Sequence, residues 1–196
     1  MEITIENIKK LKELSGVGLT DAKMALVESN GDFDKALEAM RKKGLTKAEK
    51  RGDRETREGL VDAYIHDGRL GAIVEVNCET SFVAKTDEFK TLVHQLAMQI
   101  ASMNPLYISE EDIPEETRTA KMQELENNFK GPENMKKQIL AGQMKKAFSD
   151  QILLNQPYIL DDTKTVNEFI KEAIAKTGEN ITIRQFKRIE LGVTES

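Results

Sequence analysis

The segment from Val61 to Val76 constrains the fold more than any other. Apolar residues alternate with other residues on both sides of Asp67-Gly68, at Val61, Ala63 and Ile65 and again at Ala72, Val74 and Val76. An Asp-Gly pair between two alternating runs predicts a β-hairpin, because glycine readily adopts the positive φ of a two-residue turn. A further run from Ile181 to Leu191 predicts a final strand, with a bulge between Ile183 and Phe186 where the alternation slips.

Residues 1–46 are predicted to form three short helices. Thr4, Thr20 and Asp32 stand where helix caps belong, and the helices are expected to end at Ser15-Gly16, Asn30-Gly31 and Gly44. Three helices in so few residues indicate a compact bundle of the ubiquitin-associated (UBA) type.

The segment 47–58 that follows is strongly charged: nine of its twelve residues carry a charge, five basic and four acidic. It is interpreted as a solvated linker, with an RNA-contacting segment as the alternative. The interleaved acidic residues weaken that alternative.

Residues 59–196 are predicted to form an α+β core with an antiparallel sheet. Thr86 begins a helix that ends at Asn104-Pro105, and Thr165 with Glu168 has the spacing of a capping box for a helix closed by Gly178. Between them, helices at about 114–129 and 133–148 predict a charged helical hairpin, about 110–149, that projects from the body. Gln156 to Leu160 is read as a short edge strand. The fold class is therefore α+β, a three-helix UBA-like bundle followed by this core.

The amino-acid composition limits the classes of partner and the cellular compartment that fit this chain. With 29 basic and 34 acidic residues the net charge is -5, which disfavours nucleic acid as the main partner. The single cysteine, Cys78, excludes an intrachain disulfide and favours a reducing compartment. The first residues predict an amphipathic helix, so we expect no signal peptide, and no run of about 18 apolar residues occurs. We therefore expect a cytoplasmic protein with no membrane contact.

Signatures of catalysis are absent from the sequence. His66 and His94 are the only histidines, and with one cysteine they cannot build a zinc site. Neither GxGxxG nor GxxxxGK[ST] occurs, so no phosphate-binding loop is predicted. We expect neither an enzyme nor a bound cofactor or metal, which leaves binding as the function.

Two features indicate binding, and each has two readings. In the loop Gly16-Val17-Gly18-Leu19 the glycines permit a tight turn, and Leu19 either points outward or folds back into the helical core. Phe82, in the connection between the hairpin and the next helix, is either a plug over the hairpin or an exposed anchor.

Both features resemble signatures of the elongation factor Ts family. The first stands here as Leu11, Ser15, Gly16, Gly18 and Leu19, followed by Asp21, Lys23, Ala25 and Leu26; the second is the run Glu75 to Lys85, EVNCETSFVAK. Gly178-Glu179-Asn180-Ile181 and Arg188 to Gly192 are also similar to the family. The likeness covers essentially the whole chain, and the length resembles that of the compact members with one copy of the core subdomain.

The resemblance implies a guanine nucleotide exchange factor for elongation factor Tu that acts by binding alone. Thr80, Ser81, Phe82 and Val83 would disturb the Mg²⁺ and phosphate region of elongation factor Tu, with Phe82 as the wedge. The N-terminal domain would dock through Val17, Gly18, Leu19, Thr20 and Lys23. The helical hairpin and the final strand would add further contact or self-association as a homodimer, so residues 59–196 would also serve as a dimerisation domain.

One position departs from the family pattern. Ser81 stands where the family usually has Asp, which predicts that binding persists and exchange weakens, by about 1–3 kcal/mol if the lost carboxylate made a charge-assisted contact. Two other readings make different predictions. A UBA-type adaptor would need only the first 44 residues, and an RNA-binding ribosome-associated protein would work through segment 47–58 with steep salt dependence.

Overall fold

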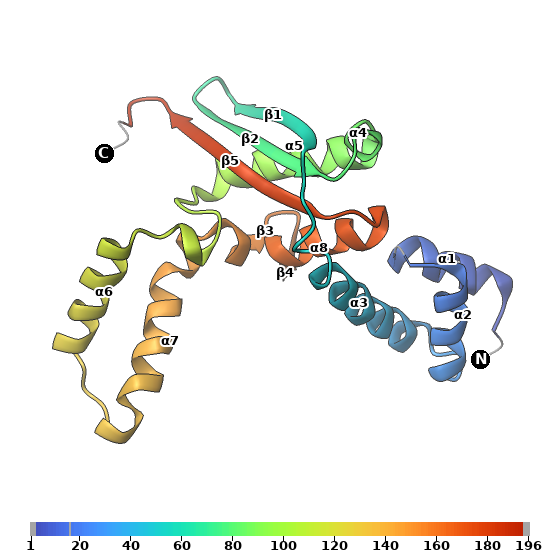
Figure 1. Ribbon diagram of the computed structural model, residues 1–196, viewed down its shortest axis with the longest axis horizontal. Helices are drawn as coiled ribbons and strands as arrows, with labels where there is room; N and C mark the ends of the chain where they lie inside the picture. Colours follow the sequence, from blue (N-terminus) through green and yellow to red (C-terminus); the bar gives the residue numbers. More distant parts are fainter. Residues whose placement is uncertain (1–2, 16, 194–196) are drawn as a thin grey trace.

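The computed structural model describes residues 3–15 and 17–193, with the backbone alone for Leu45 and Lys47 (Figure 1). The helices are α1 (Ile5–Ser15), α2 (Leu19–Glu28), α3 (Phe33–Glu49), α4 (Ser81–Ala84), α5 (Asp87–Met103), α6 (Glu115–Asn127), α7 (Lys136–Phe148) and α8 (Val166–Thr177). The strands are β1 (Glu58–His66), β2 (Leu70–Cys78), β3 (Pro157–Tyr158), β4 (Asp161–Thr165) and β5 (Ile181–Glu190). The fold is α+β, as predicted: three N-terminal helices precede an antiparallel sheet covered by helices.

Helices α1 to α3 pack into a bundle around a small aliphatic core. The backbone N–H of Asn7 donates to Thr4 Oγ1 at 3.2 Å, and that of Lys35 donates to Asp32 Oδ1 at 3.1 Å, so the predicted caps of α1 and α3 are confirmed. The buried residues of this bundle are Leu11, Val17, Ala22, Ala25, Leu26, Ala36 and Met40.

Two helix limits in this region were predicted wrongly. Helix α2 begins at Leu19 behind Gly18, so Thr20 lies in its first turn and does not cap it. Helix α3 passes through Gly44 and ends at Glu49, so the first residues of the charged segment 47–58 are helical. The reason is tertiary: the second half of α3 packs on α8, and this contact outweighs the helix-ending tendency of glycine.

The main sheet has three antiparallel strands in the order β1-β2-β5. The predicted bulge is confirmed, because Glu75 pairs with Gln185 whereas Val76 pairs with Ile183, which leaves Arg184 as the extra residue. The hairpin is also confirmed, but its loop spans three residues, 67–69, since His66 pairs with Leu70. Asp67 and Gly68 both have positive φ, at 49° and 66°.

Helices α5 and α8 cover one face of this sheet and enclose the main core (Figure 1). The N–H of Phe89 donates to Thr86 Oγ1 at 3.2 Å, and Asn104 ends α5 with a φ of 45°, so both predicted ends of this helix are confirmed. The capping box of Thr165 and Glu168 and the closing Gly178 of α8 are present as predicted. The opposite face of the sheet is covered by no helix of the described residues.

Helices α6 and α7 pack together and project from the body as the predicted helical hairpin (Figure 1). Strand β3 falls within the predicted edge strand, but it pairs with β4, which sequence reasoning missed. Within residues 3–15 and 17–193, no helix is long and apolar enough to cross a membrane.

Candidate functional site

Phe82 is the most exposed large apolar side chain in the connection between β2 and α5. It lies on the one-turn helix α4, directly after β2, and is 80% exposed. Its neighbours Val83 and Ala84 are buried in the main core and hold the turn on the sheet. The plug reading of Phe82 is therefore wrong, because the side chain points away from the core and is exposed.

Thr80 fixes the base of this turn. Its hydroxyl accepts from the N–H of Val83 at 3.4 Å and so caps α4. The same hydroxyl donates to one carboxylate oxygen of Glu179 at 2.6 Å, and the N–H of Thr80 donates to the other oxygen at 3.0 Å. Glu179 belongs to the turn between α8 and β5, so a residue 99 positions away holds Thr80 with both of its oxygens.

A second set of bonds runs beside the first. The N–H of Asn180 donates to Glu79 Oε1 at 2.6 Å, and Arg54 reaches the same oxygen at 3.5 Å. The amide of Asn180, which is 2% exposed, donates to the carbonyls of Gly52 and Arg54 at 3.1 and 2.7 Å. The turn 178–180 thus connects the base of α4 to the linker that leaves α3. Sequence analysis assigned no functional residue to the turn 178–180, because no local pattern predicts a hydrogen bond between residues about 100 positions apart.

The N-terminal loop divides between core and surface. Val17, predicted as a contact residue, is 7% exposed and lies in the core of the bundle. Leu19 is 53% exposed, so its outward reading is confirmed, and Gly18, Thr20 and Lys23 are exposed with it. Gly16 lies outside the described residues.

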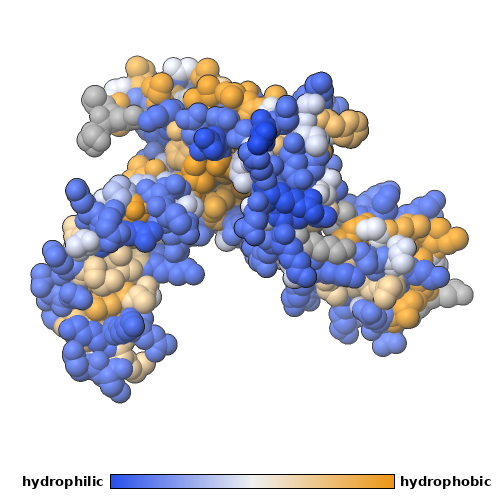
Figure 2. Space-filling model, viewed as in Figure 1, coloured by the Kyte–Doolittle hydropathy of each residue, from blue (hydrophilic) through white to orange (hydrophobic). Residues whose placement is uncertain are grey.

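Exposed apolar side chains continue along α2 beyond the predicted set. Met24 is 51% and Val27 is 54% exposed, and Figure 2 shows hydrophobic residues on the visible surface of the bundle. The helical surface available to a partner is therefore longer than the loop that the sequence singled out. The signal for it was present in the apolar residues of α2 that fall outside its buried stripe.

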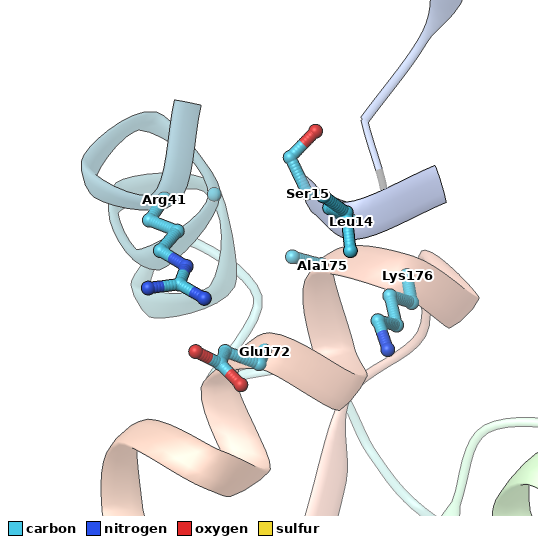
Figure 3. A pocket seen from close by; sticks show the side chains of 7 residues that line it. Leu14, Ser15, Arg41, Glu172, Ala175 and Lys176 are labelled. Atoms are coloured by element: carbon cyan, nitrogen blue, oxygen red, sulfur yellow. The ribbon is translucent and has the colours of Figure 1, made fainter. Parts of the chain in front are cut away.

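Close packing of α3 on α8 sets the bundle in place relative to the core. Glu49 and Lys171 form an ion pair at 2.7 Å, and Arg51 Nη1 donates to the carbonyl of Ile174 at 3.4 Å. A cavity of about 40 Å³ remains between the two parts (Figure 3). It is lined by Leu14, Ser15, Arg41, Gly44, Glu172, Ala175 and Lys176. A space of that size holds about one water molecule, so it is a packing gap and not a ligand site.

The two histidines and the cysteine lie in structural contacts. His94 Nδ1 lies 3.0 Å from Asp62 Oδ2, and His66 Nδ1 lies 3.0 Å from the hydroxyl of Tyr64. Burial, together with the charge of Glu179, raises the pKa of the Cys78 thiol, which keeps the thiol protonated. Among the described residues, no group of three or more His, Cys, Asp or Glu side chains is placed to hold a metal ion. The arrangement that remains is an exposed Phe on a firmly held turn and an exposed helical surface.

The sequence was compared with known families and proteins. The model of the family described as "Elongation factor TS" matches residues 22–192. Elongation factor Ts of Thermotoga maritima is 49% identical over 194 residues, which cover 98% of each chain. Elongation factor Ts of Thermoanaerobacter pseudethanolicus is 49% identical over 196 residues, covering 97% of this chain and 95% of that one. Elongation factor Ts of Moorella thermoacetica is 47% identical over 194 residues, covering 97% and 96%.

Proposed function

This chain belongs to the elongation factor Ts family, and from that premise we propose that it is the guanine nucleotide exchange factor of elongation factor Tu. The observation that carries the proposal is Phe82, which is 80% exposed on a turn whose other apolar residues are buried. Removing so large an aromatic side chain from water against a partner would contribute favourable binding free energy. The factor works in the cytoplasm, by binding and without a covalent step.

In this proposal Phe82 enters an apolar slot in the nucleotide-binding domain of elongation factor Tu. Thr80 and Ser81 are exposed beside it and disturb the region that holds Mg²⁺ and the phosphates of GDP. Val83, which was also predicted as a contact residue, is 6% exposed in the main core and instead supports the turn from within. Because Mg²⁺ and the phosphate-binding loop together retain GDP, losing either contact opens the site. By linkage, factor and GDP each weaken the binding of the other, and GTP later displaces the factor.

The exposed surface of the bundle supplies the second contact. Gly18, Leu19, Thr20 and Lys23 dock on the same domain of elongation factor Tu, while Val17 supports the loop from within the core. Met24 extends this surface along α2. Neither contact requires nucleic acid, in keeping with the net charge of -5.

The test is the rate of labelled GDP release from elongation factor Tu, measured by stopped flow. Burying a Phe side chain contributes about 1.5–3 kcal/mol, so Phe82→Ala should slow factor-stimulated release about 10- to 100-fold. Leu160→Ala is the matched control, because Leu160 is 56% exposed and lies outside both contact surfaces. If Phe82→Ala released GDP as fast as the parent, the wedge assignment would be wrong.

Ser81 is the first residue of α4, is exposed, and lies directly before the wedge residue Phe82. The family usually has Asp at this position, and a carboxylate there adds a charge-assisted contact to the partner. We therefore expect Ser81→Asp to raise the rate of GDP release above that of the parent, while the contact made by the N-terminal bundle stays the same in both proteins. No gain in Ser81→Asp would mean that this position does not limit exchange.

The open face of the sheet supports self-association. Exposed apolar residues on all three strands form what we define as the outer sheet face: Val61, Ala63, Ile65, Ile73 and Ile189. Figure 2 shows hydrophobic residues along the upper edge, where Figure 1 places these strands. The strand register places an acid and a base, Glu75 and Lys187, on this face, where they can pair between two copies. A second copy of the chain is the proposed occupant.

Light scattering after size exclusion tests the dimer. Ile65→Lys together with Ile189→Lys places like charges in the face and should yield monomers from a dimeric parent. Leu106→Lys, at a residue 59% exposed outside this face, should leave the mass unchanged. A dimer of moderate affinity has a dissociation constant of about 10 μM or below. A parent protein that is still monomeric at a concentration of tens of micromolar would therefore refute self-association.

A further inference from the structure

We infer that Glu179 is a positioning residue for the wedge, and that it orders Phe82 before any partner arrives. This inference rests on the proposed function, because it assigns a role within that same contact. Both oxygens of the Glu179 carboxylate are used on Thr80, one for the backbone N–H at 3.0 Å and one for the hydroxyl at 2.6 Å. Such two-point, charge-assisted contacts fix orientation as well as position.

The consequence passes from Thr80 to Phe82 through a single turn. Thr80 caps α4 with the hydroxyl that it also donates to Glu179, so the rotamer that caps the helix is the rotamer that Glu179 selects. Helix α4 has only four residues, and so short a helix does not persist without outside contacts. Val83 and Ala84 anchor its inner side in the core, and Glu179 anchors its beginning.

Phe82 depends on this turn for its direction. Its side chain is 80% exposed. Releasing Thr80 would let the turn sample other conformations, and only the competent fraction could enter the slot. The apparent affinity then falls by that fraction, although every partner-contacting residue is still present.

The place of Glu179 in the fold explains why its contact is firm. The preceding Gly178 closes α8 with a φ of 77°, and the following Asn180 is buried and bonded to Glu79, Gly52 and Arg54. The backbone on both sides of Glu179 is thus fixed. Its carboxylate is presented to Thr80 without the loss of freedom that a mobile loop would suffer.

Since the chain contains no Trp, Phe82→Trp supplies a single tryptophan on the wedge, which can be excited selectively over the three Tyr. In this background, Glu179→Gln keeps the size of the side chain but removes its charge and one of its two acceptors. We expect lower steady-state anisotropy of the introduced tryptophan in the free protein, and, in the Phe82 parent, GDP release slowed on the order of tenfold at sub-saturating factor. The loss should shrink as the factor approaches saturation, since a population effect acts on apparent affinity.

Thr80→Val removes the hydroxyl bond of the same contact and leaves the backbone N–H in place. If the two residues act as a unit, the double variant Glu179→Gln/Thr80→Val should be no slower than the slower single variant. Asp162→Asn, which removes one charge from exposed β4, is the matched control and should leave both readouts unchanged. Should Glu179→Gln fail to fold, Glu179→Asp, which keeps the charge but withdraws the carboxylate from Thr80, carries the anisotropy and release measurements.

The outcomes separate this inference from the proposed function. Unchanged anisotropy and unchanged release in Glu179→Gln, with Phe82→Ala impaired, would overturn the role of Glu179 and leave the exchange function standing. Additive losses in the double variant would also overturn it. If Phe82→Ala itself had no effect, the proposed function would fail, whereas the anisotropy of the tryptophan in Phe82→Trp would still report whether Glu179 orders the turn.

Discussion

Gly44 offers a direct test of how the bundle is fixed to the core. It lies inside α3, where glycine costs about 0.5–1 kcal/mol relative to alanine. A Cβ at this position would stand 3.3 Å from Cβ of Ala175 on α8, slightly closer than ordinary contact. Gly142, inside α7, has no atom within 4 Å of a Cβ built on it and is the matched control.

The expected magnitudes follow from these two environments. Gly142→Ala should stabilise the protein by about 0.5–1 kcal/mol, because only the helix preference changes. Gly44→Ala should be nearly neutral, since crowding against Ala175 offsets the same gain. Gly44→Leu should cost about 1–3 kcal/mol from overpacking, less the helix gain, for a net loss on the order of 1 kcal/mol or more.

Urea unfolding followed by circular dichroism at 222 nm measures these differences. With a slope of about 2 kcal/mol per M, a change of about 1 kcal/mol moves the midpoint by roughly 0.5 M. The slope itself should not change, because none of the variants alters the surface exposed on unfolding. If Gly44→Ala gained as much as Gly142→Ala, α3 and α8 would not be in close contact, and the bundle would not be fixed in the way described.

The remaining predictions concern single contacts. Cys78 should react slowly with a thiol reagent in the native state and rapidly in urea, because burial raises the pKa of its thiol. Since that pKa is higher in the folded state, the stabilisation is complete below the unfolded-state pKa and is lost as the pH rises past it; Cys78→Ala should flatten the alkaline decline of the urea midpoint. The N–H of Lys35 lowers the pKa of the Asp32 carboxyl, so the cap of α3 is fully present above the usual pKa of 3.8 and weakens as the pH falls through the lower folded value. The amide exchange of Lys35 should therefore speed up in acid, and Asp32→Asn should reduce this pH dependence. Thr86→Ala should lower stability by about 1 kcal/mol, since the N–H of Phe89 loses its cap, and the urea midpoint measures this loss.

Local signals in the sequence predicted the features that local physics decides. The caps at Asp32 and Thr86, the end of α5 at Asn104 and the bulge near Arg184 each depend on a few neighbouring residues, and all are present. Gly44 shows the limit of such reasoning, because its local preference to end a helix is outweighed by a contact with α8, far away in sequence.

The faces of β1 show a second limit. Alternation indicates that Val61, Ala63 and Ile65 share a face, but not which face meets the core. The pairing of Ala63 with Ile73 puts this apolar row on the outer sheet face, while Tyr64 packs against the main core. Strand β1 thus places apolar residues on the solvent-exposed face and Asp62 and Tyr64 on the core-facing side, the reverse of the usual pattern. Such a reversal is typical of a surface that contacts a partner.

The candidate site could be predicted only in part for the same reason. Phe82 and Leu19 were found from their position in loops, where functional residues concentrate. Whether each pointed outward depended on packing, and Val17, two residues from Leu19, is instead buried. Glu179 was beyond local reasoning altogether, since its meaning depends on Thr80.

The two contact surfaces of the proposed complex are parts of one connected unit, and this has an energetic consequence. The bundle that carries Leu19 is fixed to the core where α3 packs on α8 and Glu49 pairs with Lys171. The turn that carries Phe82 is fixed, through Thr80 and Glu179, to the segment directly after α8. When two contacts are held at a fixed separation, binding at the first raises the effective concentration of the second, and stiffness at a matching separation maximises the gain. Residues that touch no partner, such as Gly44 and Glu179, should therefore affect exchange by altering that separation or the order of the wedge. Their effects should appear in the apparent affinity, whereas removal of Phe82 should lower the release rate even when the factor saturates elongation factor Tu.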